Sequence, residues 1–254
     1  MLPEIRISDQ FVFSTYFVYI GLLYTFLVYW VYRCSNKQNL NTSMALNLAL
    51  IIMVVGFIGA RLAHVIWEAP QIYSQHPSAI FKFWLGGFVF YGGALPAVLA
   101  CLVYLKKQKQ SLTMWLDFFA PIGALGYGLG RISCLLAGCC YGSSCDLPWA
   151  IGGKHPTQAY ATVWELSVFV YLNIRSQNFF SNKQTKPHVP KNLKPGQLFA
   201  EWIALHAIGR MVMEYYRDDF RGDMILGISI STWISLLLFS AAVAGLWKIK
   251  ARSS

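Results

Sequence analysis

Charged residues are scarce in this sequence, and acidic residues are the scarcest. Only 13% of the 254 residues are Asp, Glu, Lys or Arg, and 11 acidic residues stand against 21 Lys and Arg. Hydrophobic residues make up 56% of the chain, and its mean hydropathy is +0.45. This composition excludes an ordinary soluble domain, in which about a quarter of the residues are charged.

The sequence also lacks the signs of a cleavable leader or of modular organisation. Its first apolar run is too long for a signal peptide and has neither a basic flank nor a small-residue cleavage pattern. No internal repeat, heptad pattern or low-complexity block divides it. We therefore expect residues 1–254 to form a single integral membrane domain.

Long hydrophobic runs fill most of the chain. A run of about 20 residues is long enough to span a bilayer as a helix. We therefore expect an all-α polytopic membrane protein with seven transmembrane helices. These helices are predicted near residues 11–32, 43–67, 84–104, 113–137, 158–174, 197–216 and 225–247.

The basic residues are concentrated in alternate loops, where no acidic residue accompanies them. These cations are Arg33, Lys37, Lys106, Lys107, Lys109, Arg175, Lys183, Lys186, Lys191, Lys194, Lys248, Lys250 and Arg252. The opposite loops hold Glu4, Asp9, Glu68, Asp146, Asp218, Asp219 and Asp223. The positive-inside rule then puts the N-terminus outside and the C-terminus in the cytoplasm. The net charge of +10 thus reflects topology, and nucleic acid is not an expected partner.

Three arginines interrupt apolar segments. Arg131 lies near the start of the stretch 130–142, which continues into glycines and cysteines. A charge in hydrocarbon is costly, so such a residue usually faces an interior cavity. By the predicted topology Arg61, Arg131 and Arg210 lie at nearly the same depth, each about six residues below the outer surface. Three guanidiniums at one level suit an anion, and arginine matches phosphate well, so we expect a phospholipid headgroup there.

An alternative interpretation is that these arginines only neutralise buried charge. Arg210 would then pair with Glu214, and Arg61 or Arg131 with Glu165. His206, Arg210 and Glu214 are spaced four residues apart, which puts them on one helical face.

Other polar and small residues are predicted near the same level. Tyr91, Gln158, Glu165 and His206 fall in the outer half of the membrane, and Tyr16 is close enough to the outer end to reach a polar cavity. The glycine-rich segment 86–96 predicts a bent helix whose backbone approaches a ligand or another helix, or simply a kinked packing helix.

Several motifs in one order carry a family resemblance over nearly the full length. The signature is Gly130-Arg131 followed by Gly138 and Tyr141-Gly142. The other motifs are, in chain order, Gly59-Ala60-Arg61, Gly92-Gly93, His155-Pro156-Thr157-Gln158-Ala159-Tyr160 with Glu165, and Arg210 with Glu214 and Arg217. In these motifs the chain resembles the prolipoprotein diacylglyceryl transferase family. The resemblance implies a seven-helix enzyme of the bacterial plasma (inner) membrane, with its active site toward the outer leaflet. It also implies the same N-out, C-in topology as the charge pattern.

The resemblance implies the reaction and its partners. The diacylglyceryl group of phosphatidylglycerol would move to the lipobox cysteine in the signal peptide of a prolipoprotein, releasing glycerol phosphate, with membrane lipids as surroundings. A thiolate would attack the glycerol carbon attached to phosphate. Arg131 and Arg210 are the expected clamp on the leaving phosphate. His206 is the expected base. Tyr91 ranks second because an ordinary tyrosine pKa, about 10, is far above that of histidine.

The remaining residues of the predicted site bind substrate. They are Tyr16, Arg61, Gly92, Gly93, Cys134, Gly138, Cys139, Gly142, His155, Gln158, Tyr160, Glu165 and Glu214. The chain departs from the family pattern at four positions. Cys134 stands in place of an asparagine and Cys139 in place of an acidic residue. Tyr91 replaces a histidine, and His206 replaces a tyrosine.

Four cysteines lie near the predicted outer face, at Cys134, Cys139, Cys140 and Cys145. Their spacing fits no standard zinc pattern, so no metal or other cofactor is expected. A disulfide between Cys139 or Cys140 and Cys145 is one interpretation. The others are packed thiols and a reactive or acyl-accepting cysteine.

These departures leave other functions open. A related enzyme could use phosphatidylglycerol but give the diacylglyceryl group to a different acceptor. A second class is a non-catalytic lipid-binding or transport protein, and a third is a membrane thiol-redox protein that uses the cysteine cluster.

Overall fold

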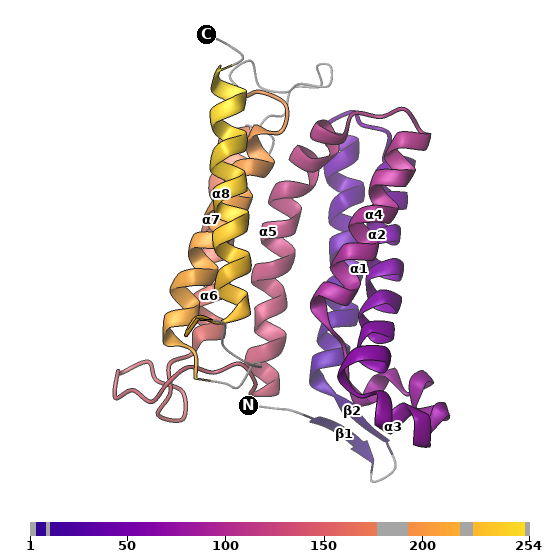
Figure 1. Cartoon of the computed structure of the whole chain (residues 1–254), viewed down its shortest axis with the longest axis vertical. Helices are drawn as coiled ribbons and strands as arrows, with labels where there is room; N and C mark the ends of the chain where they lie inside the picture. Colours follow the sequence, from indigo (N-terminus) through magenta and orange to yellow (C-terminus); the bar gives the residue numbers. More distant parts are fainter. Residues whose placement is uncertain (1–3, 9–10, 177–192, 219–225, 252–254) are drawn as a thin grey trace. The chain divides into compact units, whose positions relative to one another are not determined.

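The computed structural model of the chain describes residues 4–8, 11–176, 193–218 and 226–251 (Figure 1). Most of the predicted cytoplasmic loop, residues 177–192, lies outside the described residues, as do Asp9, Asp219 and Asp223. The fold divides into two compact units. Unit 1 comprises Met1–Leu23 with Thr113–Ser254, and unit 2 comprises Tyr24–Leu112.

The long helices coincide with the predicted hydrophobic segments. They are α1 (Thr15–Lys37), α2 (Thr42–Ala63), α4 (Phe90–Lys107), α5 (Leu112–Ala137), α6 (Thr157–Ser176), α7 (Gln197–Tyr216) and α8 (Ile230–Ala251). Among the described residues, four segments are long and apolar enough to cross a membrane, namely α1, α2 with the turn after it, α5 and α8. The chain is therefore a largely helical, multi-pass membrane protein.

The N-terminal segment differs from the all-α prediction. Strands β1 (Glu4–Ser8) and β2 (Phe11–Ser14) pair antiparallel, with Glu4 opposite Ser14, and α1 begins only at Thr15. The predicted helix start at residue 11 is therefore wrong. A short apolar run does not by itself distinguish a strand from a helix, and here the pairing of two backbone segments decides it.

The segment between α2 and α4 also differs from the two long helices predicted there. It contains a π-helical turn (His64–Glu68), the short helix α3 (Pro70–Gln75) and two 3₁₀ turns, Pro77–Phe81 and Phe83–Leu85. Gly86 and Gly87 follow with φ of +86° and +84°, a left-handed backbone that ends any helix. The predicted helix over 84–104 consequently begins at Phe90.

Helices α2 and α4 of unit 2 approach each other through glycines. A Cβ added at Gly92 would lie 2.1 Å from the Cβ of Ala63, and one at Gly93 would lie 2.4 Å from the carbonyl oxygen of Gly56. Such close approach requires residues without side chains. Of the interpretations offered for the glycine-rich segment, the structure supports close packing of this pair against another helix.

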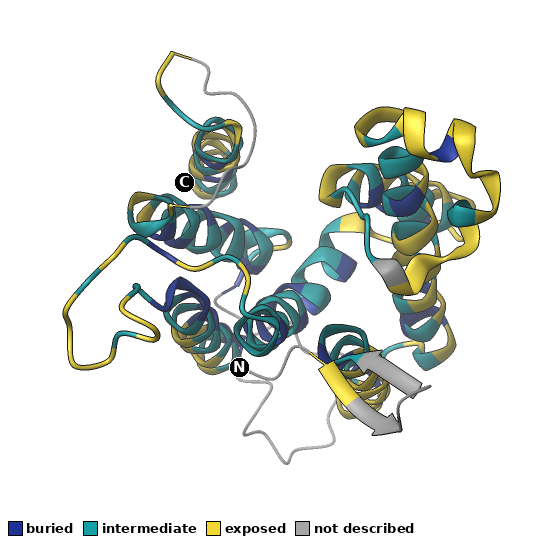
Figure 2. Ribbon diagram, turned by 90° about the horizontal axis from the view of Figure 1, so that it is seen from below, coloured by how far each residue is buried: buried dark blue, intermediate teal, exposed yellow. Residues whose placement is uncertain are grey.

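The core of unit 1 lies between α5, α6, α7 and the chain just before α7. Its buried residues are Ala124, Val168, Leu172, Leu193 and Leu198, with Trp164 and Trp202 packed against them. Exposed residues occur on the same helices as buried ones, as Figure 2 shows. On α8 the outward residues are large and apolar, with Leu237 69% and Trp247 70% exposed. Apolar side chains on the outside of a helix are suited to contact with lipid.

Candidate functional site

The two predicted catalytic arginines meet at one tyrosine hydroxyl in unit 1. The Tyr127 hydroxyl accepts a hydrogen bond from Arg131 Nη2 at 2.5 Å and from Arg210 Nη1 at 3.3 Å. Tyr127 lies one turn before Arg131 on α5, whereas Arg210 comes from α7. The guanidinium carbon of Arg131 is also 4.8 Å from the centroid of the Tyr127 ring, within range of a cation–π contact. One aromatic residue therefore brings two positive charges together.

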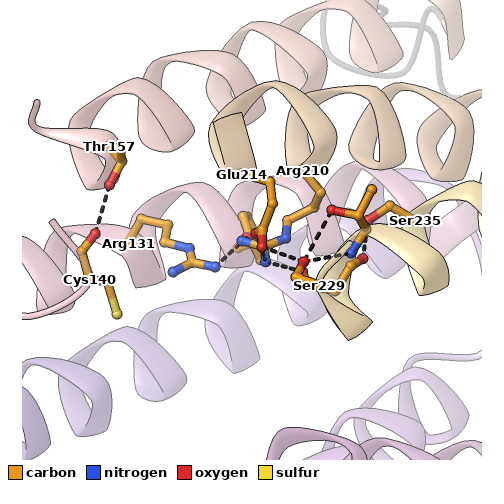
Figure 3. A network of polar contacts seen from close by, with 10 residues as sticks. Arg131, Cys140, Thr157, Arg210, Glu214, Ser229 and Ser235 are labelled. Carbon is orange, nitrogen blue, oxygen red and sulfur yellow. Dashed lines mark hydrogen bonds and ion pairs between the residues drawn. The ribbon is translucent and has the colours of Figure 1, made fainter. Parts of the chain in front are cut away.

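Arg210 has further partners on α7 and α8, and Figure 3 shows Arg131 extending toward this group. Arg210 Nη2 donates to the hydroxyl of Ser231 at 2.6 Å and lies 3.7 Å from Glu214 Oε2. The hydroxyl of Ser229 donates to Glu214 Oε1 at 2.5 Å. The ion pair of the charge-neutralising alternative is thus present for Arg210.

Arg131 differs from Arg210 in its counter-charge. Within the described part of the chain, no ion pair joins Arg131 to a carboxylate. Glu165, which the same alternative assigned to Arg61 or Arg131, pairs with His206 instead. The Arg131 guanidinium is therefore the less compensated of the two charges.

A pocket gathers these groups with a third arginine. It is small and lined by Arg131, Cys140, Thr157, Gln158, Ala161, Arg210, Met213 and Arg217. A second small pocket shares Ala161, Arg210 and Met213 with it and is also lined by Tyr127 and Glu165. Three guanidiniums around one small space suit an anion such as phosphate.

His206 and Glu165 form a hydrogen-bonded pair between α7 and α6. His206 Nδ1 lies 2.6 Å from Glu165 Oε1, and Glu165 is only 2% exposed. The ring of Tyr127 meets the His206 imidazole edge-on, with centroids 4.6 Å apart. A carboxylate at Nδ1 favours the tautomer whose Nε2 carries the free lone pair. The pair can therefore orient an imidazole that accepts a proton at Nε2.

The motif at residues 155–160 supports the backbone of the cysteine stretch. The Thr157 hydroxyl donates to the carbonyl of Cys140 at 2.7 Å, as Figure 3 shows, and the Gln158 side-chain amide donates to the carbonyl of Cys139. Gln158 is 2% exposed. These bonds explain why two polar side chains are buried at the start of α6.

Other predicted residues of unit 1 lie in the same loop region. Gly138 directly follows α5 with a φ of +73°. The amide of Gly142 donates to the carbonyl of His155 at 2.8 Å, and the His155 ring contacts Tyr160 and Tyr216. These residues hold the loop between α5 and α6 against the end of α7.

Three of the cysteines converge, and all six carry free thiols. The sulfurs of Cys134, Cys139 and Cys140 lie within 4.8 Å of one another. Of the interpretations offered for these cysteines, a disulfide between Cys139 or Cys140 and Cys145 is therefore not the one that the structure shows. Cys140, which follows Cys139 in the loop after α5, adopts a left-handed backbone with a φ of +61°.

The thiol pKa values follow from these neighbours. The pKa of Cys140 is lowered by hydrogen bonding to the thiols of Cys134 and Cys139 and by the guanidiniums of Arg217 and Arg131. The pKa of Cys139 is raised by its hydrogen bonds with the same two partner cysteines, Cys134 and Cys140. The thiol that lines the arginine pocket is thus the one favoured as a thiolate.

Arg61 belongs to unit 2 and is surrounded by backbone carbonyls. Only 7% exposed, it donates to the carbonyls of Ala79 at 2.7 Å, Ile80 at 3.1 Å and Gly87 at 3.0 Å. The carbonyls of Lys82 and Gly86 are further acceptors. Arg61 therefore ties the short turns after α2 to the helix itself. Its role in binding substrate stays a prediction.

The other predicted residues outside the pocket are Tyr91, Gly92, Gly93 and Tyr16. Tyr91, in the first turn of α4, is 43% exposed, and the two glycines face α2. Tyr16 is half-buried at the start of α1, beside Phe17. Their predicted roles are neither supported nor opposed by these contacts.

The residues that connect the site were not among the predicted ones. Tyr127, Ser229 and Ser231 had no role assigned, and Arg217 was noted only as part of a motif. The four-residue spacing between Tyr127 and Arg131 puts both side chains on one face of a helix, and this spacing could have identified Tyr127. The two serines lie at the start of the mostly apolar α8. The sequence alone does not distinguish serines there that face the protein interior from serines at the membrane surface.

Comparisons with known proteins identify the family of the chain. The family model of prolipoprotein diacylglyceryl transferase matches residues 5–248. The phosphatidylglycerol–prolipoprotein diacylglyceryl transferase of Nitrosomonas europaea is 33% identical over 89% of this chain and 84% of its own. The enzyme of that name from Bordetella avium is 31% identical over 92% and 90%, and that from Clostridium tetani is 29% identical over 80% and 79%. The resemblance carried by the motifs is confirmed.

Proposed function

The chain belongs to the prolipoprotein diacylglyceryl transferase family, and on that premise we propose that it transfers the diacylglyceryl group of phosphatidylglycerol to the lipobox cysteine of a prolipoprotein. The observation that carries the proposal is the pocket lined by Arg131, Arg210 and Arg217. A site with three guanidiniums suits the phosphate of the donor lipid, and the phosphate leaves with the glycerol as glycerol phosphate.

Arg131 is the principal phosphate ligand in this proposal. Arg210 already has Glu214 at 3.7 Å, whereas no carboxylate pairs with Arg131 among the described residues. The leaving phosphate gains negative charge as the carbon–oxygen bond breaks, so a fixed cation stabilises the transition state more than the bound lipid. Arg210 and Arg217 orient the same phosphate from the other walls of the pocket.

His206 is the base that activates the acceptor. An unperturbed cysteine has a pKa of about 8.5, so only a small fraction is thiolate at neutral pH. His206 Nε2 accepts the thiol proton while Glu165, 2.6 Å from Nδ1, stabilises the imidazolium that forms. The sulfur bonds to the glycerol carbon, and the electron pair of the broken carbon–oxygen bond departs on the phosphate. Tyr91 remains the second candidate for this role.

All seven long helices span the membrane in this proposal, with the N-terminus outside, the C-terminus in the cytoplasm and the pocket toward the outer leaflet of the bacterial plasma membrane. Lys106 and Lys107 lie in the last turn of α4, and Lys248 and Lys250 lie in the last turn of α8. The positive-inside rule expects such basic residues at cytoplasmic ends. Helices α6 and α7 are less apolar than the four clear candidates because they carry the polar residues of the site.

The test is a transfer reaction with the purified full-length protein. A synthetic lipobox peptide is incubated with phosphatidylglycerol vesicles, and its mass is measured. A gain of one diacylglyceryl unit that Arg131→Ala abolishes is the expected result. Release of glycerol phosphate without modification of the peptide would indicate a different acceptor. No turnover of either substrate, together with failure to complement cells depleted of their own transferase, would overturn the proposal.

A further inference from the structure

The cysteine cluster formed by Cys134, Cys139 and Cys140 is not used in the proposed reaction. Each of these residues supplies one sulfur, and the three sulfurs lie within 4.8 Å of one another. The Sγ atoms of Cys139 and Cys140 are 3.6 Å apart. A fourth cysteine, Cys145, belongs to the same loop but not to the cluster.

We propose that the cysteine cluster binds one Cu(I) ion through three thiolates. The spacing of the sulfurs suits a shared metal better than a disulfide. With metal–sulfur bonds of about 2.3 Å, three sulfurs around one ion lie about 4 Å apart. A disulfide requires about 2.05 Å between two sulfurs and leaves the third without a role.

The number and type of ligands favour Cu(I) over other metals. Thiolates select soft ions, chiefly Cu(I) and Zn(II). A structural zinc site takes four protein ligands, whereas the cluster brings together only three among the described residues. Three sulfurs without a nitrogen or oxygen ligand therefore suit the softer, lower-coordinate ion.

The surroundings supply the counter-charge that such a site needs. Three thiolates and Cu(I) carry a net charge of −2. Arg131 and Arg217 line the same pocket as Cys140, so two guanidiniums face the complex. The exposed position of Cys139 gives the ion a route of entry. Binding releases the thiol protons and changes no oxidation state, because the metal enters as Cu(I).

The test is a competition for copper under anaerobic, reducing conditions. The full-length protein in detergent is titrated with Cu(I) in the presence of a chromophoric Cu(I) chelator. The wild-type protein is expected to withhold one equivalent, with only sulfur in the first coordination shell by X-ray absorption. Cys139→Ser is expected to weaken binding at least tenfold. Because Cys139 is exposed, the metal-free variant should unfold at the same temperature as the wild type.

Two controls make the result specific. Cys145→Ser lies in the same loop and Cys101→Ser in α4, and both variants should bind Cu(I) like the wild type. Failure of the wild type to withhold copper, or binding that Cys139→Ser leaves intact, would overturn the inference. Tighter binding of Zn(II) than of Cu(I) would do so as well. Because the readout is metal binding, it is independent of the proposed transferase activity.

Discussion

Arg61 and Arg131 look alike in the sequence, since each is a lone cation in the C-terminal part of an apolar helix, but their surroundings differ. Arg61 donates to backbone carbonyls of residues 79–87. Arg131 meets a tyrosine hydroxyl and lines a pocket. A guanidinium whose donors are all used by carbonyls holds a loop, whereas one that lines an open pocket can bind an anion. The contacts of Arg61 are therefore those of a structural charge, whereas Arg131 is placed as the proposed phosphate site requires.

The largest expected effect is that of Arg131→Ala on catalysis. Loss of a fixed cation that stabilises the leaving phosphate should lower kcat/KM about 10³-fold, while the midpoint of thermal unfolding stays close to that of the wild type. Peptide modification measured by mass spectrometry gives the rate. Arg175→Ala is the matched control, because Arg175 pairs with Glu201 at 3.6 Å away from the pocket. Activity within tenfold of the wild type would remove Arg131 from the clamp.

Substitution of the proposed base should have the next largest effect. His206→Ala is expected to lower kcat about 10²-fold, in the range of general base catalysis. Glu165→Gln should lower kcat about tenfold with little change in KM, because it weakens the orientation of the imidazole without touching the lipid. His76→Ala, at an exposed histidine, serves as control. Full activity of His206→Ala would move the role of base to Tyr91.

Arg61→Ala tests the other side of the comparison. Loss of several charged hydrogen bonds to buried carbonyls should destabilise unit 2 by about 3 kcal/mol and lower the midpoint of thermal unfolding. The activity of the protein that remains folded should fall less than tenfold. Arg33→Ala, at an exposed position of the same unit, should change neither quantity. A loss of activity as large as that of Arg131→Ala, at unchanged stability, would instead make Arg61 a ligand of the substrate.

The smallest effect is expected for Tyr127→Phe, which removes only the hydroxyl shared by Arg131 and Arg210. Both guanidiniums keep their other contacts, so we expect KM for phosphatidylglycerol to rise about fivefold with kcat nearly unchanged. Tyr171→Phe, which removes a hydroxyl bonded to Glu201, is the control. A fall in kcat with constant KM would show that the hydroxyl acts in the reaction itself.

Much of the helical framework was predictable because hydrocarbon imposes strong constraints on a sequence. The prediction for 113–137 agrees with α5 and that for 197–216 with α7. The exceptions are places where local backbone chemistry overrides hydrophobicity. Gly86 and Gly87 delay the start of α4, and pairing with β1 turns residues 11–14 into a strand.

The candidate site was predictable in its residue types but not in its connections. Arg131, Arg210 and His206 were selected because charged groups are costly in a membrane and so usually have a function. Arg217 was passed over as a pocket residue because it lies just beyond α7, outside the apolar run. The converging sulfurs of the cysteine cluster could not be foreseen from spacing, since Cys139 and Cys140 lie in a loop whose backbone path has no sequence period.

The sequence by itself determined the family, the membrane character and the positions of the long helices, because hydrophobic length and short motifs are local properties of a chain. Only the tertiary structure decided which buried charge is compensated and by what. The acceptors of Arg61 lie 18 to 26 residues further along the chain, and Arg210 meets Tyr127 across 83 residues. Partners so distant are chosen by helix packing, and that choice gives two arginines with similar sequence surroundings different contacts.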